Sequence, residues 1–293
     1  MVIRDSWGDR IFHGTSVILV WFVVILTFYP FLYVFSSSIS DPVSVLQNKV
    51  FLWPVGFSLK PYLTILHYPE MTIGYLNTVF YTVVGTAINM LLSCLMAYPL
   101  SRKSLVFRKY FMIMITFTLV FSGGLIPTFL IVNELGMVDT RWALLIPGAI
   151  SSWNVILLKT FFESLPKELE EAATIDGSSP MNILFRIILP LSTPAFVTIS
   201  LFYAVGHWNS YFPAMIYLTN ENLYPVQLFL RKIVLLGQTA DIMGEQGLGT
   251  DKLVMAESLK YATIMLVALP IVAVYPFIQK YFVKGAMLGS LKG

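Results

Sequence analysis

Residues 71–101 read MTIGYLNTVFYTVVGTAINMLLSCLMAYPLS, and none of these side chains is charged. A helix that crosses a bilayer needs about 20 mainly apolar residues, so this stretch is long enough to span a membrane. The whole chain has the same character, because 57% of its 293 residues are hydrophobic and 12% are charged. A soluble domain carries about 25% charged residues. The composition therefore excludes a soluble domain and predicts an all-α, polytopic membrane protein.

Five further apolar stretches flank this one. The fourth and sixth are short between charges, but Lys159, Lys260 and Lys280 can snorkel to the interface and lengthen them. The first is interpreted as an uncleaved helix, because residues 35–38 contain no A-x-A cleavage site. We therefore expect one membrane domain over residues 1–293, with six transmembrane helices at about residues 12–36, 72–98, 110–133, 141–161, 191–218 and 260–281.

Positive charge is unevenly shared between the two sides of these spans. One side holds the N-tail, the second and fourth loops and the C-tail, which contain twelve of the 19 Lys and Arg residues. The second loop contributes most strongly, with Arg102, Lys103, Arg108 and Lys109 and no acid. The positive-inside rule places this side in the cytoplasm, so both termini are expected inside (N-in/C-in).

The fourth loop is cytoplasmic in this topology, and residues 164–190 read SLPKELEEAATIDGSSPMNILFRIILP. Its first half predicts a short helix over about residues 165–175. Ser164 is a suitable N-cap for this helix, and Gly177 is a natural C′ stop. The three glutamates of its first turns suit the positive end of the helix dipole.

The second half of the loop predicts another short helix over about residues 179–189. Ser179 followed by Pro180 is a typical start, and Pro190 is expected to limit the helix. From these features alone, an ordinary packed connector between two spans remains an alternative to a docking unit.

The spacing of residues within the loop favours the docking unit. Glu171-Ala172-Ala173, three residues, Gly177, nine residues, Ile187, one residue and Leu189-Pro190 resemble the EAA-x3-G-x9-I-x-LP loop of bacterial ABC importer permeases. Asp176 before Gly177 is similar to that family's usual variant. The resemblance covers nearly the whole chain, and it implies a multi-pass permease subunit of the bacterial cytoplasmic (inner) membrane rather than an enzyme.

What the resemblance implies is mechanical. The first short helix would be a coupling helix that lies in a cleft on an ATPase subunit and moves with it when ATP binds. The residues implied in ATPase coupling are Glu170, Glu171, Ala172, Ala173, Asp176, Gly177, Leu189 and Pro190. The implied partners are a second homologous permease subunit, two ATPase subunits and a solute-binding protein, together with the lipid bilayer and no nucleic acid.

The chain resembles the carbohydrate-uptake branch of these importers, and within it the relatives of the maltose permease's smaller subunit and the lipo-oligosaccharide permease subgroup. Asn77-Thr78, Trp208-Asn209 and the ending of residues 281–293 carry this resemblance. It implies a saccharide cargo, an oligosaccharide or a polysaccharide such as alginate or its fragments. It also implies that the tail of residues 284–293 reaches the ATPase interface, with a basic end near anionic lipid as the alternative.

Several kinds of chemistry are not indicated by the sequence. No G-x-x-x-x-G-K-[ST] loop occurs, so we expect no cofactor bound by this chain and ATP and magnesium on the partner ATPase. His13, His67 and His207 are scattered, so neither catalytic residues nor a metal site is expected. No charged residue lies centrally in a span, which argues against the runner-up interpretation, an ion-coupled secondary carrier. An importer of another solute class also remains open.

A translocation path for sugars needs aromatic faces and hydrogen-bonding groups. Two clusters of such side chains lie within predicted spans, and the alternative is that they join helices or belong to an interfacial belt. The candidates are Asn89, Ser93, His207, Trp208, Asn209 and Tyr211. Outside the membrane, residues 51–61 and 224–236 could contact a solute-binding protein, with a plain surface hairpin as the alternative.

Overall fold

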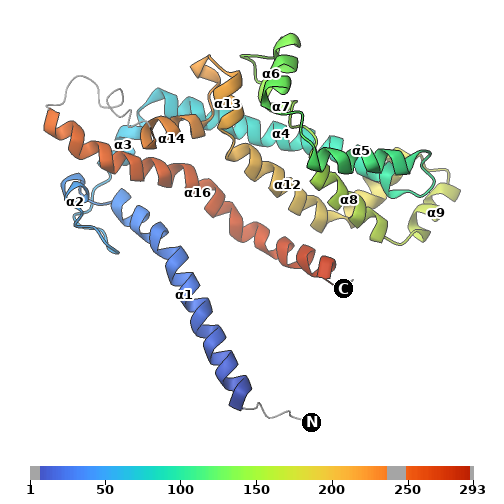
Figure 1. The fold of residues 1–293 in the computed structure, drawn as a ribbon, viewed down its shortest axis with the longest axis horizontal. Helices are drawn as coiled ribbons and strands as arrows, with labels where there is room; N and C mark the ends of the chain where they lie inside the picture. The colour runs from blue at the N-terminus through green and yellow to red at the C-terminus, as the bar shows by residue number, and fades with distance from the viewer. Residues whose placement is uncertain (1–6, 236–248, 291–293) are drawn as a thin grey trace. The chain divides into compact units, whose positions relative to one another are not determined.

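The computed structural model describes residues 7–235 and 249–290, and Figure 1 shows that they form helices joined by loops. The described residues fall into two compact units, one of residues 7–71, 230–235 and 249–269 and the other of residues 72–229 and 270–290. The longer helices are α1 (Trp7–Ser38), α4 (Pro69–Ser101), α5 (Arg108–Val120), α6 (Leu125–Glu134), α8 (Ser152–Ser164), α12 (Thr193–Trp208) and α16 (Gly249–Ser290). The shorter ones include α2 (Pro42–Leu46), α3 (Lys60–Leu66), α7 (Trp142–Leu145), α9 (Glu168–Ile175), α10 (Pro180–Ile183), α11 (Leu189–Leu191), α13 (Phe212–Tyr217) and α14 (Val226–Val234).

The first unit consists of α1, the short helices α2 and α3, and residues 249–269 of α16. Most of α1 is apolar and exposed, with Trp21 and Phe22 more than 60% accessible. Its C-terminal end is buried instead, and there the Ser38 hydroxyl accepts a hydrogen bond from Tyr62 at 2.7 Å. Asp41 caps α2 by accepting from the Ser44 amide. An exposed apolar helix of this length is what a lipid-facing span requires.

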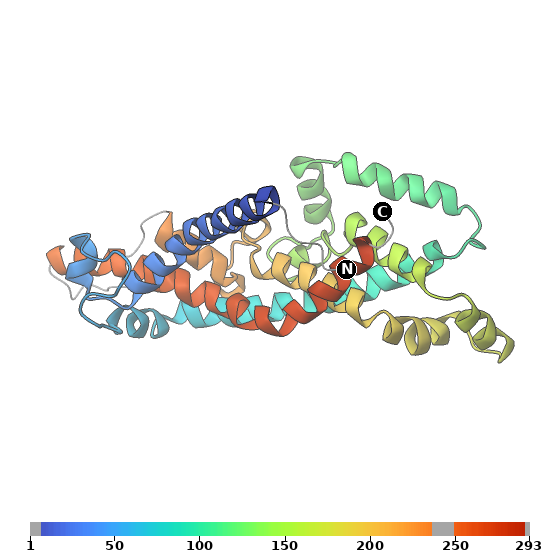
Figure 2. The same ribbon diagram turned by 90° about the horizontal axis from the view of Figure 1, so that it is seen from below.

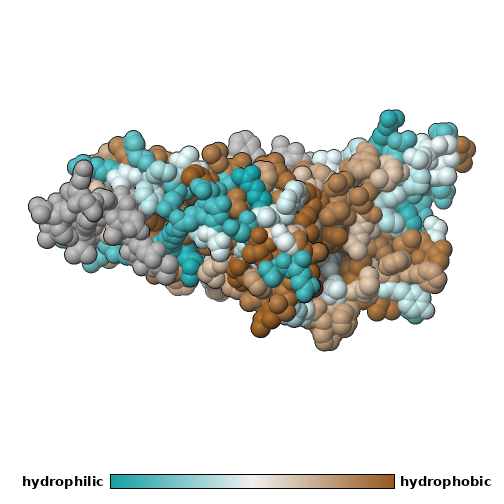
Figure 3. Space-filling view, turned by 90° about the horizontal axis from the view of Figure 1, so that it is seen from above, coloured by the Kyte–Doolittle hydropathy of each residue, from teal (hydrophilic) through white to brown (hydrophobic). Residues whose placement is uncertain are grey.

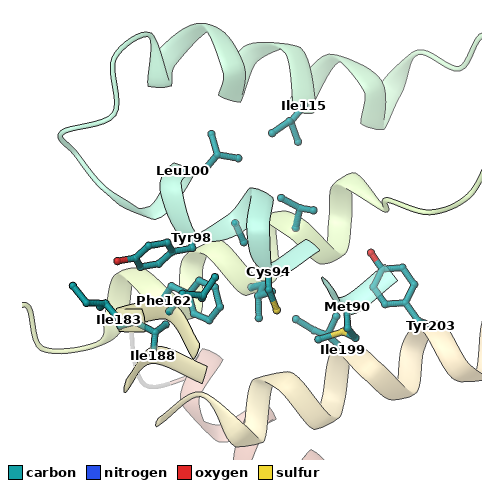
Figure 4. Close-up of a cluster of buried hydrophobic side chains, with 14 of the residues drawn as sticks. Met90, Cys94, Tyr98, Leu100, Ile115, Phe162, Ile183, Ile188, Ile199 and Tyr203 are labelled. Atoms are coloured by element: carbon teal, nitrogen blue, oxygen red, sulfur yellow. The ribbon is translucent and has the colours of Figure 1, made fainter. Parts of the chain in front are cut away.

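The second unit is built around α4, with α5, α8 and α12 packed on it. Its main hydrophobic core gathers side chains from these four helices and from α9 and α10, and Figure 4 shows how they point toward one another. Leu158 and Phe162 of α8 are fully buried at its centre, beside Cys94 of α4. This core therefore reaches from the transmembrane helices to the short helices of the fourth loop.

Three described helices are long and apolar enough to cross a membrane, namely Trp7–Ser38, Pro69–Ser101 and Val254–Pro276. Two bent pairs of helices raise the number to as many as five. The polytopic, all-helical class is thus confirmed. The count of six and the N-in/C-in orientation stay predictions.

The predicted spans of residues 110–133 and 191–218 are not continuous helices. The first is divided into α5 and α6, which meet at 113° across Gly123 and Gly124. Gly124 has a φ of +85°, a conformation that stops a helix. The second begins with an 89° bend after α11, and α12 ends at Trp208 before the separate α13.

The predicted span of residues 141–161 is also interrupted. It comprises α7 and the 13-residue α8, with Pro147 and Gly148 between them. Proline lacks an amide donor and glycine favours irregular backbone, so the ladder of helical hydrogen bonds ends here. Figure 2 shows these helices from below, and in the space-filling view of Figure 3 hydrophobic residues reach much of the visible surface.

Candidate functional site

Helix α9 of the fourth loop begins later than the sequence predicts. Ser164 is the last residue of α8, and its hydroxyl donates to the Phe161 carbonyl instead of capping α9. Leu165 is extended, and α9 runs from Glu168 to Ile175. Pro166 explains the difference, because the residue before a proline is kept out of the helical region.

The end of α9 confirms the predicted role of Gly177. The Ser178 amide donates to the Ala173 carbonyl at 2.9 Å, and the Gly177 amide donates to Thr174 at 3.0 Å. These two bonds define a Schellman motif with Gly177 at C′ and a φ of +76°. The tight turn then brings Ser179 into position as the N-cap of α10, where its side chain accepts from the Asn182 amide.

One carboxylate ties α9 to the end of α4. Glu170 accepts a hydrogen bond from the Tyr98 hydroxyl at 2.8 Å, and its other oxygen lies 2.7 Å from Arg102 Nη1. The guanidinium of Arg102 also lies over the Tyr98 ring, 4.8 Å from its centroid. We call these three residues the Glu170 clasp. Both side chains of the ion pair are about one fifth exposed, so water screens it only partly.

The two alanines of the loop differ in their burial. Ala173 is buried in the core of the second unit, whereas Ala172 is exposed. Residues adjacent in a helix are about 100° apart, so the two alanines do not thin one common face of α9. Glu171, Asp176 and Gly177 are exposed with Ala172, and Ile175 is 85% exposed.

A groove of about 880 Å³ lies beside this exposed face. Arg102 and Lys103 line it from the end of α4, and Glu170, Glu171 and Ile175 line it from α9. The groove therefore offers both charges and an apolar side chain to whatever lies against α9.

The second half of the loop is less regular than predicted. After α10, residues Leu184–Ile188 form a π-helix, and α11 follows as Leu189–Leu191. Pro190 lies inside α11, and the turn comes at Ser192. The prediction that Pro190 ends the helix is wrong, since the helix continues to Leu191. The wider π-turn before Pro190 accommodates a residue that has no amide donor.

Asn89, one of the candidate path residues, is buried and engaged within the second unit. Its Nδ2 donates to the carbonyls of Gly148 and Ala149 at 2.9 and 2.8 Å, and its Oδ1 lies 2.6 Å from His207 Nε2. Since that oxygen can only accept, His207 carries its proton on Nε2. The imidazole packs so closely on Gly85 that a residue with a Cβ would not fit at position 85.

The remaining path candidates divide into buried and exposed residues. Ser93 bonds to the Tyr203 hydroxyl at 2.7 Å, and Trp208 is buried edge-on against Tyr75. Asn209 and Tyr211 are exposed, and Asn209 accepts from Gln227 at 3.3 Å. The buried set joins α4 to neighbouring helices, as the alternative interpretation predicts, whereas Asn209 and Tyr211 are accessible.

Asn77 and Thr78, near the other end of α4, hold the chain that precedes α14. Asn77 donates to the carbonyls of Asn222 and Tyr224, and Thr78 accepts from the Val226 amide at 2.8 Å. Val226 is fully buried and Leu228 is buried with it. The hairpin alternative for residues 224–236 is therefore wrong up to Leu235, since α14 occupies this segment, and residue 236 lies outside the described residues.

Two further predictions fall partly beyond what the structure describes. Backbone helix continues through the tail to Ser290, but residues 291–293 lie outside the described residues. Among the residues that the structure describes, no three His, Cys, Asp or Glu side chains are grouped so as to hold a metal ion.

Apolar helices with a helix-glycine-helix loop at the end of the core define an all-helical, multi-pass membrane protein. Residues 89–287 match the family described as binding-protein-dependent transport system inner membrane component, and the chain belongs to this family. It is a multi-pass protein of the cytoplasmic membrane.

Curated relatives from Bacillus subtilis (strain 168) match over nearly the full length. The polygalacturonan/rhamnogalacturonan transport system permease protein YtcP is 45% identical over 99% of this chain and 100% of its own, and protein LplC is 40% identical over 99% and 98%. A chain of a bacterial ABC transporter involved in the import of the acidic polysaccharide alginate superposes with a TM-score of 0.85 and 35% identity, covering 95% of this chain and 99% of its own.

Proposed function

We propose that this chain is the permease subunit of an ABC importer and that α9 is the element that an ATPase subunit grips. The observation that carries the proposal is the construction of α9. Its outer face, with Glu171, Ala172 and Ile175, is open to a partner, while Ala173 and the Glu170 clasp fasten its inner face to the core. A helix fastened on one side and open on the other can pass a movement from a partner to the spans.

The energy for transport comes from outside this chain in this proposal. The sequence has no phosphate-binding loop and no charged residue centrally in a predicted span, so neither ATP binding nor ion coupling is expected of it. Two ATPase subunits would bind ATP and magnesium, and a second homologous permease would complete the path. A solute-binding protein would deliver the cargo from the side opposite to α9. In this proposal α9 and both termini lie in the cytoplasm, because the loops on that side carry most of the Lys and Arg residues.

Movement would then travel from α9 to α4. When the ATPase pair closes on ATP, α9 is carried with it, and Glu170 pulls on Tyr98 and Arg102 at the end of α4. Asn89 and Ser93 on the same helix bond to α12 and to the chain before α8. These bonds spread the movement of α4 to its neighbours, which rock between inward-facing and outward-facing states. Asn209 and Tyr211 are the candidates for direct contact with cargo.

The cargo in this proposal is an acidic oligosaccharide or polysaccharide. Both the YtcP relative and the superposed transporter chain have acidic polysaccharides in their descriptions, polygalacturonan and alginate. Uronate chains carry a carboxylate on each sugar and expose hydroxyls and apolar ring faces. Alginate oligosaccharides and oligogalacturonates are therefore the first cargoes to try, with neutral oligosaccharides as the comparison.

Reconstitution of the complete transporter in proteoliposomes tests this proposal. The chain is co-expressed with its partner permease and ATPase, and ATP hydrolysis is measured with the solute-binding protein and a panel of sugars. We expect stimulation by acidic oligosaccharides and little by neutral ones of the same length. Stimulation of ATP hydrolysis by an amino acid or a neutral sugar alone would contradict the proposal of an acidic saccharide cargo. Uptake driven by an ion gradient without ATP would favour the secondary carrier.

A further inference from the structure

A second groove of about 830 Å³ lies along α5 and shares Lys103 with the groove beside α9. Four cations line it: Lys103 from the second loop, Arg108 and Lys109 at the start of α5, and Lys159 from α8. Farther along α5 the lining is apolar, with Ile113, Phe117 and Phe121. The groove is thus positively charged near one end of α5 and hydrophobic toward the other.

The charge of this groove is only partly neutralised by the chain itself. Glu163 pairs with both Arg108 and Lys159, the latter at 2.9 Å. Among residues 7–235, neither Lys103 nor Lys109 has an acidic side chain within ion-pair distance, and both are exposed. Four cations face one carboxylate, so the charged end attracts an anion.

The apolar end has the length of a lipid chain. Helix α5 has 13 residues, which extend about 20 Å at about 1.5 Å per residue. One leaflet of a bilayer has a hydrocarbon depth of about 15 Å, half of the full core. Figure 4 shows Ile115 pointing from α5 toward the core, and it is the buried residue of this helix. The groove side chains Ile113 and Phe117 are more than half exposed.

We propose that this groove binds one anionic phospholipid, with its phosphate on Lys103 and Lys109 and an acyl chain along Ile113 and Phe117. A soluble anion would use the cations and leave the apolar lining empty, whereas a lipid uses both. Basic pockets at the cytoplasmic ends of transmembrane helices bind anionic headgroups in this way. The assignment requires only that the chain spans the bilayer, so it stands or falls independently of the cargo.

Native mass spectrometry of the complete transporter in detergent tests the lipid site. Phosphatidylglycerol and phosphatidylcholine with the same acyl chains are titrated onto the wild type and onto the Lys103→Gln/Lys109→Gln variant. Each lysine near an anionic headgroup is worth about a fivefold change in affinity, so we expect phosphatidylglycerol binding to fall about 25-fold. Phosphatidylcholine binding should be unchanged. The mass of the complex reports whether the variant still assembles.

Two matched variants separate headgroup from chain. Lys49→Gln/Lys60→Gln removes two exposed lysines elsewhere in the chain and should bind phosphatidylglycerol like the wild type. Ile113→Asn places an amide in the apolar lining and should weaken both lipids.

Equal binding of the two lipids by the wild type would overturn the proposal, as would displacement of phosphatidylglycerol by inorganic phosphate. Failure of phosphatidylglycerol to bind, with Lys103 and Lys109 protected from amine labelling in the complex, would place a protein partner on the patch instead.

Discussion

Gly177 is the residue on which the turn after α9 depends. Its φ of +76° is easily reached by glycine and costs a residue with a Cβ about 1–2 kcal/mol. No atom outside its immediate chain neighbours lies within 4 Å of a Cβ built at this position, so the cost is backbone strain rather than a clash. We expect Gly177→Val to insert and assemble but to lose most of its ATP-driven uptake, measured in membrane vesicles.

Asparagine provides the matched control at this position. Because Asn tolerates the left-handed region, Gly177→Asn should retain most of the uptake. If the Val and Asn variants transported equally well, the turn conformation would not be what coupling requires.

Asp139 makes the stability of the loop after α6 depend on pH. Its carboxylate accepts from the amides of Asn220 and Thr219 at 2.8 and 2.9 Å, and these bonds hold its pKa below the usual value. A lowered folded pKa means that the stabilisation is present above the unfolded pKa of about 3.9 and is lost as pH falls through the folded pKa. We expect the wild type to melt above Asp139→Asn at about pH 7, with the difference shrinking below about pH 4.

Thermal unfolding of the detergent-solubilised chain across this pH range measures the effect. A difference between the two proteins that stays constant down to acid pH would show that the charge of Asp139 does not contribute.

At the residue scale, the sequence predicts the ends of the short helices only where side chains act locally. Gly177 and Ser179 work through their own backbone, and both roles are confirmed. Tyr98 and Arg102 could not be assigned to Glu170, because they lie about 70 positions away and only the fold brings them together. From the sequence alone, Arg102 contributes only to the positive charge that predicts the cytoplasmic side.

At the scale of elements, the Glu170 clasp is the link between α9 and α4. Glu170→Gln removes the charge that pairs with Arg102, and Tyr98→Phe removes the other hydrogen bond. We expect each variant to lower uptake per ATP hydrolysed severalfold. Because both changes act on one side chain, the double variant should lose less than the product of the two single effects.

Glu168→Gln is the control, since Glu168 is exposed in the first turn of the same helix. It should leave coupling near the wild-type level. Independent, multiplicative losses in the Glu170 and Tyr98 variants would contradict a shared clasp.

Charge-free runs predict where membrane helices lie better than they predict where helices break. Helices α1 and α4 follow their runs closely. Residues 110–133 form an equally apolar run, yet the chain turns at Gly123 and Gly124. The glycine pair is a signal in the sequence, but bilayer helices tolerate glycine, so packing decides whether the helix continues.

At the scale of the whole molecule, membrane class and family follow from composition and one loop. The number of spans does not, because helices such as α8 are short and are completed by irregular chain. Irregular backbone at membrane depth is stable only when it is packed inside protein, as where Asn89 binds the carbonyls of Gly148 and Ala149. Hydropathy alone contains no information on such contacts.

The central proposal is that an ATPase subunit docks on the exposed face of α9. Single cysteines at Ala172 and Ile175, in a Cys94→Ala background, test it by cross-linking in the assembled transporter, with Leu63→Cys on α3 as the control. We expect Ala172→Cys and Ile175→Cys to cross-link to the ATPase subunit and Leu63→Cys not to do so. An ATPase that co-purifies but cross-links to neither position on α9 would contradict the proposal.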